Sequence, residues 1–293
     1  MKRLLVTGAS GLVGSHLLRQ AAGWFESVGT WHSFRPEGLP GRIELLDITD
    51  PIAVGAFLDG FQPQYIIHCA AMSDSVRAER EPDIARQLNV TATAALVRHA
   101  ERIRARLVFL SSDVIFDGRK NAPYVEDDPP SPLGVYAATK RDAELAVRDG
   151  CDDWLIARTS LIYGPSPRGD RSVNERLGAA IGEGRRITLF VDEFRCPISV
   201  VDLAAALLEL VDSPHRGVFH LAGPERINRY DLGLAFARHF GWPTTTMEAC
   251  KISDVPMSPP RPADVTLDCR KALAVLKAKP RGVAEGLRGL PAR

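Results

Sequence analysis

The chain has 293 residues, of which 45% are hydrophobic and 25% are charged, the usual mixture of a soluble globular protein. Its 37 basic and 36 acidic side chains give a formal net charge of +1, so no overall field favours nucleic acid or an anionic membrane. No stretch approaches the ~20 apolar residues that a membrane helix needs, and the five cysteines lack metal-ligand spacing. We therefore expect a reduced, cytoplasmic protein with no metal site and with neither nucleic acid nor membrane as a partner.

Short aliphatic runs alternate with longer amphipathic runs in the first half of the chain. This alternation predicts an α/β fold of the Rossmann type, in which a doubly wound parallel sheet is covered by helices on both faces. Such sheets bind ligands at the carboxyl ends of their strands. The predicted strands are residues 3–7, 27–30, 42–46, 65–68, 106–111 and 154–157, and the predicted helices are residues 12–22, 52–58, 82–102 and 135–148.

After Gly164 the alternation weakens, which predicts a smaller C-terminal substrate-binding region. We expect a Rossmann domain at residues 1–164 and the substrate-binding region at 165–293, with about 196–222 returning to the Rossmann domain. Beyond a loop at 165–170, the predicted elements are helices at 173–181, 201–211, 230–240 and 271–277 and strands at 187–191 and 217–221, with a proline-rich segment at 256–262.

Three glycines, Gly8, Gly11 and Gly14, follow the first predicted strand and open the first predicted helix. Glycine permits a tight turn and lets the backbone approach a pyrophosphate closely, and the first N–H groups of the helix then bind the anion. The sequence therefore predicts a dinucleotide site at this turn. The residues expected to contact the cofactor here are Gly8, Ser10, Gly11, Leu12 and Val13.

The end of the second predicted strand indicates which dinucleotide binds. A site for NAD places an acidic residue about 20 residues beyond the glycines, where it binds the ribose hydroxyl. Here the stretch reads GTWHSFRP, with Trp31 followed by His32, Ser33 and Arg35 and no carboxylate. His32 and Arg35 instead suit a 2′-phosphate, which they would bind with charge-assisted hydrogen bonds. We therefore expect NADP(H) as the cofactor.

Tyr136 and Lys140 are four residues apart in a predicted helix, so their side chains share one face. A free tyrosine has a pKa of about 10, and a nearby ammonium favours the phenolate, which would make Tyr136 a usable general acid or base. Ser112 follows a predicted strand and therefore lies at the edge of the sheet where ligands bind. We predict that Ser112 holds a substrate carbonyl while Tyr136 supplies a proton and Lys140 also holds the cofactor ribose.

The Gly-x-x-Gly-x-x-Gly spacing and the order Ser112, Tyr136, Lys140 resemble the extended short-chain dehydrogenases/reductases. This resemblance implies that Ser112, Tyr136 and Lys140 are catalytic and that Tyr136 and Lys140 also contact the cofactor. It further implies cofactor contacts from Asp47, Ile48, Cys69, Ala70 and Ala71.

Within that family, the blocks LSSDVIFDG, RTSLIYG, PISVVDLA, HLAG and RPADVTLD resemble dTDP-4-dehydrorhamnose reductases. The resemblance implies NADPH-dependent reduction of a nucleotide-linked 4-keto-6-deoxy sugar. Val114 and Leu161 stand where that group has a tyrosine and a tryptophan, so we expect a remodelled sugar pocket. Arg195 and Arg261 suit a nucleotide diphosphate. The expected substrate-binding residues are Ser112, Asp113, Val114, Leu161, Arg195 and Arg261.

Two alternatives remain at this stage. LSSDVIFDG, HCAA, QLNV and RPADVTLDCRK also resemble the regulatory β subunit of methionine adenosyltransferase, an NADP-binding partner of another enzyme. A noncatalytic role is therefore a second interpretation, and an NAD-dependent sugar epimerase or dehydratase is a third, disfavoured by the missing acidic residue after the second strand. For the oligomeric state, a monomer or a two-fold dimer is expected.

Overall fold

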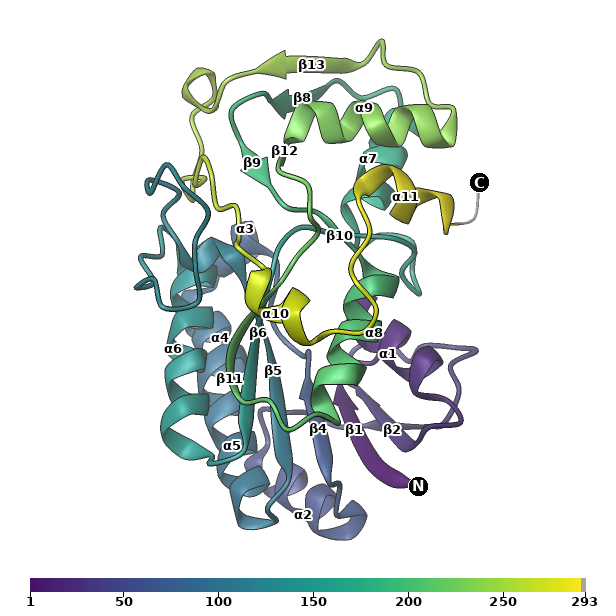
Figure 1. Ribbon diagram of the computed structural model, residues 1–293, viewed down its shortest axis with the longest axis vertical. Coiled ribbons are helices and arrows are strands. Elements are labelled where there is room, and N and C mark those ends of the chain that lie inside the picture. Colours follow the sequence, from purple (N-terminus) through teal and green to yellow (C-terminus); the bar gives the residue numbers. More distant parts are fainter. Residues whose placement is uncertain (291–293) are drawn as a thin grey trace.

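Seven parallel strands form one sheet at the centre of the computed structural model, which describes residues 1–290 (Figure 1). Each carboxyl end therefore lies at the same edge, and the predicted Rossmann-type fold is confirmed. In spatial order the strands are β11 (Gly217–Leu221), β6 (Trp154–Thr159), β5 (Arg106–Ser112), β4 (Tyr65–His68), β1 (Lys2–Thr7), β2 (Phe25–Trp31) and β3 (Arg42–Leu45).

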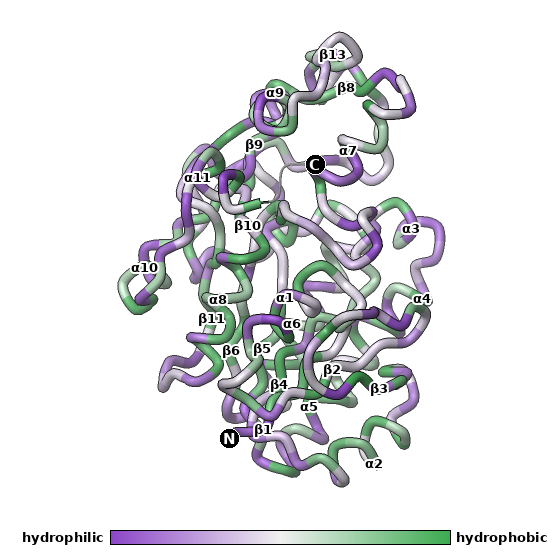
Figure 2. Tube along the Cα trace, turned by 90° about the vertical axis from the view of Figure 1, so that its right-hand side faces the viewer, coloured by the Kyte–Doolittle hydropathy of each residue, from purple (hydrophilic) through white to green (hydrophobic). Residues whose placement is uncertain are grey.

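Helices cover both faces of this sheet. On one face lie α1 (Leu12–Ala21) and α8 (Val200–Val211), and on the other lie α2 (Pro51–Phe61), α5 (Ala92–Arg102) and α6 (Val135–Gly150). Successive residues of a strand point to opposite faces, so Leu4 joins the core under α1 and α8 while Leu5 joins the other core. Figure 2 shows the strands β4, β5 and β6 as largely hydrophobic segments inside the molecule. Each fully buried aliphatic side chain contributes about 1.5–3 kcal/mol of hydrophobic stabilisation.

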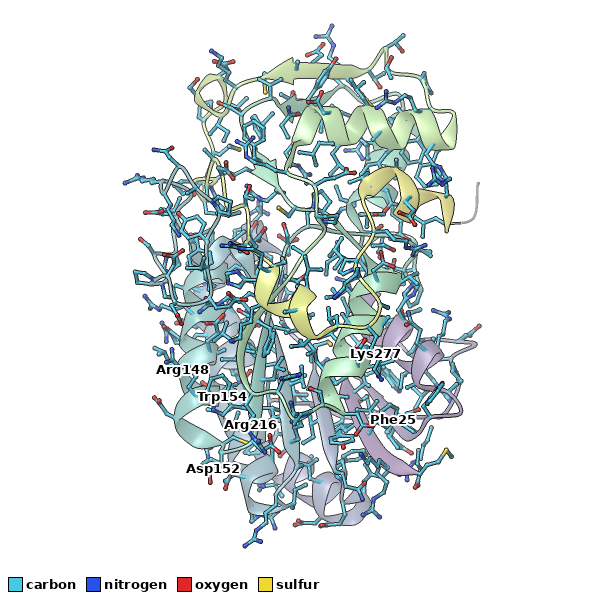
Figure 3. All side chains as sticks on the ribbon, viewed as in Figure 1. Phe25, Arg148, Asp152, Trp154, Arg216 and Lys277 are labelled. Atoms are coloured by element: carbon cyan, nitrogen blue, oxygen red, sulfur yellow. The ribbon has the colours of Figure 1, made fainter. Side chains whose placement is uncertain are left out.

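The carboxyl ends of the strands face a second, smaller region. Phe25 and Trp154, the first residues of β2 and β6, lie in the lower part of Figure 3, so both strands run upwards toward this region. Its own apolar core includes Tyr163, Leu189 and Phe236. The region contains the helices α7 (Val173–Gly182), α9 (Arg229–Phe240) and α11 (Val283–Arg288) and the strand pairs β7 (Ile162–Tyr163) with β10 (Ile198–Ser199), β9 (Phe194–Arg195) with β12 (Ile227–Asn228) and β8 (Ile187–Phe190) with β13 (Met247–Cys250).

Part of the second half of the chain returns to the sheet, since α8 packs against α1 and β11 pairs with β6. The boundary at residue 164 between two domains stays a prediction.

The helix predicted at residues 82–102 is present, but a π-helical turn interrupts it, so it consists of α4 (Pro82–Arg86), the turn (Gln87–Thr91) and α5. The amide of Asn89 inside the turn binds the backbone of Met72. The predicted helix at 271–277 is α10 (Arg270–Val275). The sequence interpretation missed α3 (Ser75–Arg80), α11, the strands β7, β9, β10, β12 and β13, and the 3₁₀ turns Asp113–Ile115 and Ile252–Asp254. No helix among residues 1–290 has the length and apolar character to cross a membrane.

Candidate active site

The glycine turn between β1 and α1 has the shape of a phosphate cradle. Gly8 has a φ of +72°, and a Cβ there would lie 2.8 Å from the backbone nitrogen of Ala70. A Cβ on Gly14 would lie 2.3 Å from the carbonyl oxygen of Gly8. Gly11 caps α1 without any side-chain hydrogen bond, so the N–H groups that begin the helix are available to an anion. This backbone geometry fits a dinucleotide pyrophosphate.

The segment after β2 is a row of exposed or half-buried polar groups beside that turn. His32, Ser33 and Arg35 are exposed, and Trp31 is half-buried. His32 Nε2 lies 3.6 Å from Asp47 Oδ2. A hydrogen bond from the hydroxyl of Thr49 lowers the pKa of Asp47, which is therefore an ionised acceptor.

Small residues after β4 form the other wall of the cradle. The backbone nitrogens of Cys69 and Ala70 each lie 3.2 Å from Thr7 Oγ1, which ties the end of β4 to the end of β1. Cys69, Ala70 and Ala71 are half-buried. Ile48, which directly follows Asp47, is buried. The expected cofactor residues thus come from four strand ends at one edge of the sheet.

The three expected catalytic residues meet at the carboxyl end of β5. Ser112 ends β5, while Tyr136 and Lys140 lie on the first two turns of α6. The hydroxyl of Ser112 lies near the phenol of Tyr136, where it acts to lower the pKa of Tyr136. The ammonium of Lys140 donates to the carbonyl oxygen of Leu110 at 2.6 Å, and its Nζ lies 3.9 Å from the ring centroid of Phe109.

The electrostatics of Tyr136 differ from the expectation. Burial, together with the carboxylate of Asp113, raises the pKa of Tyr136 to about 12, whereas we expected Lys140 to lower it. The physical reason is that the ammonium of Lys140 is directed toward Leu110 and the Phe109 ring. Tyr136 is thus a neutral phenol at pH 7, which suits donation of a proton rather than its removal.

Burial lowers the pKa of Lys140 to about 7, against 10.5 in an unfolded chain. Between these values the unfolded chain holds a proton that the folded protein has released, so the free energy of unfolding should rise with pH across this window. Urea unfolding at about pH 7 and about pH 9.5 should show the wild type gaining stability relative to Lys140→Met. A difference in free energy of unfolding between the two proteins that does not change with pH would contradict a lowered pKa of Lys140.

Two buried networks hold the catalytic residues in place. The amide of Asn89 binds Met72 and also donates to Thr139 Oγ1 at 2.9 Å, which fixes α6 beside Tyr136. On the next turn of α6, the buried Glu144 pairs with Arg158 at 2.8 Å and accepts a 2.5 Å hydrogen bond from Ser111. The second network therefore fastens α6 to β5 and β6 directly below the site. His68, with its ring between Thr7 and Thr93, is a packed histidine.

Asp113 is buried behind Ser112. It accepts hydrogen bonds from Ser160 Oγ at 2.6 Å and from Ser112 Oγ at 3.2 Å. Burial raises its pKa, although Arg195 Nε, 3.9 Å from Asp113 Oδ2, acts in the opposite direction. These contacts give Asp113 a role in orienting Ser112.

Arg195 and Arg261 differ in how they relate to the pocket. Arg195 is buried and donates to the carbonyl oxygen of Pro262 from two nitrogens, both at 3.1 Å, and it pairs with Glu193 at 3.2 Å. Its donors are thus engaged within the chain, so its contacts favour a role in holding the proline-rich segment rather than binding a diphosphate. Arg261 pairs with the same Glu193 at 3.2 Å but is half exposed. Arg229 also approaches Glu193, at 3.9 Å, so three guanidinium groups surround one buried carboxylate.

Glu193 and Arg229 were not singled out from the sequence. An isolated glutamate in a loop and an arginine at a helix start carry no pattern, and only the folded chain brings them together.

A pocket opens beside Tyr136, between α3, the start of α6 and residues 256–262. Val114 and Arg261 contribute to its walls. Leu161 is not among its lining residues and packs against the apolar core of the second region instead. The lining residues are Ser75, Val76, Val114, Leu133, Gly134, Tyr136, Ala137, Pro256, Met257, Ser258, Pro259, Pro260, Arg261 and Pro262.

This fold and site define a dinucleotide-binding protein in which Tyr136 lines the pocket and Ser112 and Lys140 lie next to it on β5 and α6. A family model described as the RmlD substrate binding domain matches residues 1–291, and the chain belongs to that family. The chain is 33% identical over 279 residues to methionine adenosyltransferase 2 subunit beta of Rattus norvegicus, covering 92% of this chain and 81% of that protein. It is 32% identical over 268 residues to Agl14 of Haloferax volcanii, a probable low-salt glycan biosynthesis reductase, covering 90% and 88%.

Solved structures show the same architecture. A dTDP-4-dehydrorhamnose reductase from Bacillus anthracis, in complex with NADP, has a TM-score of 0.85 at 23% identity and covers 98% of both chains. A hypothetical dTDP-4-dehydrorhamnose reductase from Sulfolobus tokodaii has a TM-score of 0.85 at 31% identity, covering 97% of this chain and 98% of that one. The resemblances to dTDP-4-dehydrorhamnose reductases and to the methionine adenosyltransferase β subunit are both confirmed.

Proposed function

We propose that this protein is an NADPH-dependent reductase of a nucleotide-linked 4-keto-6-deoxy sugar. One observation carries the proposal: Ser112, Tyr136 and Lys140 meet at the sheet edge where the glycine cradle lies, and a pocket opens at Tyr136. The family membership and the relatives named as reductases support it.

The residues of the cradle would hold the cofactor. We propose that the turn at Gly8 and the start of α1 hold the pyrophosphate, that His32, Ser33 and Arg35 hold a 2′-phosphate, and that Asp47 and Ile48 contact the adenine side. Small side chains at Cys69, Ala70 and Ala71 leave room for the dinucleotide beside β4. When bound, NADPH supplies hydride to the substrate carbonyl carbon.

The chain itself supplies the proton and the orientation. Ser112 lies near Tyr136, so the hydroxyls of both residues can hydrogen-bond the substrate carbonyl oxygen. Tyr136, a neutral phenol, gives its proton to that oxygen as negative charge develops there. Lys140, fixed by Leu110, lies one helical turn further along α6 and would meet the cofactor ribose. Asp113 and Ser160 hold Ser112 in position.

The test is the loss of NADPH absorbance when purified protein is mixed with a dTDP-4-keto-6-deoxyhexose, with product identified by mass. We expect turnover with NADPH and much slower turnover with NADH, because no carboxylate follows β2. Binding of NADPH without turnover of any such sugar would refute the reductase proposal.

A noncatalytic role is the second candidate, because the relative from Rattus norvegicus is named as a subunit of methionine adenosyltransferase. If this protein acts in that way, it should co-elute with a methionine adenosyltransferase catalytic subunit on gel filtration and should bind NADP without reducing sugars. Separate elution combined with sugar turnover would exclude this candidate.

A further inference from the structure

The loop that follows β7, residues 165–171, reaches back over the cofactor half of the molecule. The guanidinium carbon of Arg168 lies 5.3 Å from the ring centroid of Phe34, which stands in the segment after β2 between Ser33 and Arg35. The same loop meets α1, where Pro165 O lies 2.8 Å from Nε2 of His16. The loop from the C-terminal region is therefore held against both elements that frame the adenosine side of the cradle.

Glu175, which is buried at the start of α7, holds this loop rigid. Its Oε1 accepts from the backbone nitrogen of Ser166 at 2.6 Å, and its Oε2 accepts from the Ser166 hydroxyl at 2.7 Å. The same oxygen accepts from the backbone nitrogens of Arg171 and Ser172, each at 3.0 Å. Arg168 is thus presented from a pre-organised loop, which lowers the entropy cost of using its side chain in binding.

The existing partners of Arg168 leave it available to a ligand. Its ion pair with Asp170 spans 3.4 Å between side chains that are 48% and 49% exposed, and such a surface pair is worth at most about 1 kcal/mol. Stacking on Phe34 restricts the guanidinium to the space above the segment that carries His32 and Arg35. A planar guanidinium so placed suits bidentate recognition of a phosphate.

We propose that Arg168 is a further ligand of the cofactor 2′-phosphate, alongside His32 and Arg35, so that a residue of the C-terminal region sets the preference for NADP(H). This inference rests on the cofactor assignment within the proposed function. It makes the dinucleotide a bridge between the two regions.

The test is calorimetric titration of the protein, without sugar substrate, with 2′,5′-ADP, NADPH and NADH. Arg168→Ala should weaken binding of 2′,5′-ADP and NADPH by roughly 10- to 100-fold, the loss of one charge-assisted hydrogen-bonding partner, and should leave NADH binding nearly unchanged. Arg171→Ala is the matched control, because Arg171 lies on the same loop and pairs with the same Asp170 at 3.6 Å. It should bind all three ligands like the wild type.

Two results would overturn the inference. If Arg168→Ala weakens NADPH and NADH equally, Arg168 acts on the pyrophosphate or on the fold, not on the 2′-phosphate. If Arg168→Ala and Arg171→Ala lose affinity for NADPH to the same extent, the loss comes from removing a positive charge from the loop and not from a contact of Arg168 with the 2′-phosphate. A wild type that binds NADPH and fails to reduce sugars would count against the reductase proposal only, because the titrations with Arg168→Ala still decide this inference.

Discussion

Replacing Tyr136 by phenylalanine is expected to lower the rate of sugar reduction by about 10²- to 10⁴-fold, the usual contribution of a general acid. The ring remains and packs as before, so the change removes only the hydroxyl that lies near Ser112. Affinity for NADPH should persist, since the backbone cradle at Gly8 and Gly11 is untouched. Steady-state kinetics with NADPH, together with calorimetric titration of the cofactor, measures both quantities.

The matched control is Tyr65→Phe, which removes a tyrosine hydroxyl from the amino end of β4, at the far edge of the sheet. That hydroxyl donates to Asp212 at 2.6 Å on the surface, so its loss should leave the reduction rate intact. A Tyr136→Phe protein as active as the Tyr65→Phe control would show that another group supplies the proton.

Replacing Arg158 by methionine is expected to lower the free energy of unfolding by about 3–5 kcal/mol, the typical cost of removing one partner from a buried ion pair. The side chains of Arg158 and Glu144 are only 2% and 3% exposed, so water cannot solvate a carboxylate left alone. Ser111 would remain as one hydrogen-bond donor, at 2.5 Å, to a charge that three guanidinium contacts now neutralise. Urea unfolding monitored by circular dichroism gives the difference.

A double variant, Glu144→Leu with Arg158→Met, separates the ion pair from simple packing. It removes both charges, so we expect it to be more stable than Arg158→Met alone. If the double variant instead loses as much free energy of unfolding as the two single variants lose together, the ion pair is not the source of the loss in Arg158→Met. The Arg158→Met protein should also lose activity, because the pair fastens α6 beneath Tyr136.

The parts of the site that depend on local spacing could be predicted from the sequence. Glycines between a strand and a helix permit a tight turn in any fold. A tyrosine four residues before a lysine in a helix shares one helix face with it in any fold. The environment of these groups could not be predicted in the same way. The raised pKa of Tyr136 depends on burial and on where Lys140 points, which are tertiary properties.

The environment of Arg195 could not be predicted from the sequence either. An arginine in the second half of the chain suits a phosphate by its chemistry, but the folded chain directs it to Pro262 and Glu193. The π-helical turn at Gln87–Thr91 escaped prediction for a related reason. The residues there have ordinary helical character, and the contact of Asn89 with Met72 that accompanies the turn forms only in the folded chain.

The return of α8 and β11 to the sheet has a consequence for how the protein is made. A nascent chain that ended at residue 164 would leave β6 as an edge strand, paired only with β5, and would expose the sheet face that α8 covers in the finished protein. Leu203, Leu207 and Phe219 complete that core, and they leave the ribosome long after the glycine turn and the catalytic residues. The sheet of the cofactor half is therefore incomplete during synthesis until Leu221 has emerged, and we expect its uncovered face to be prone to aggregation until then.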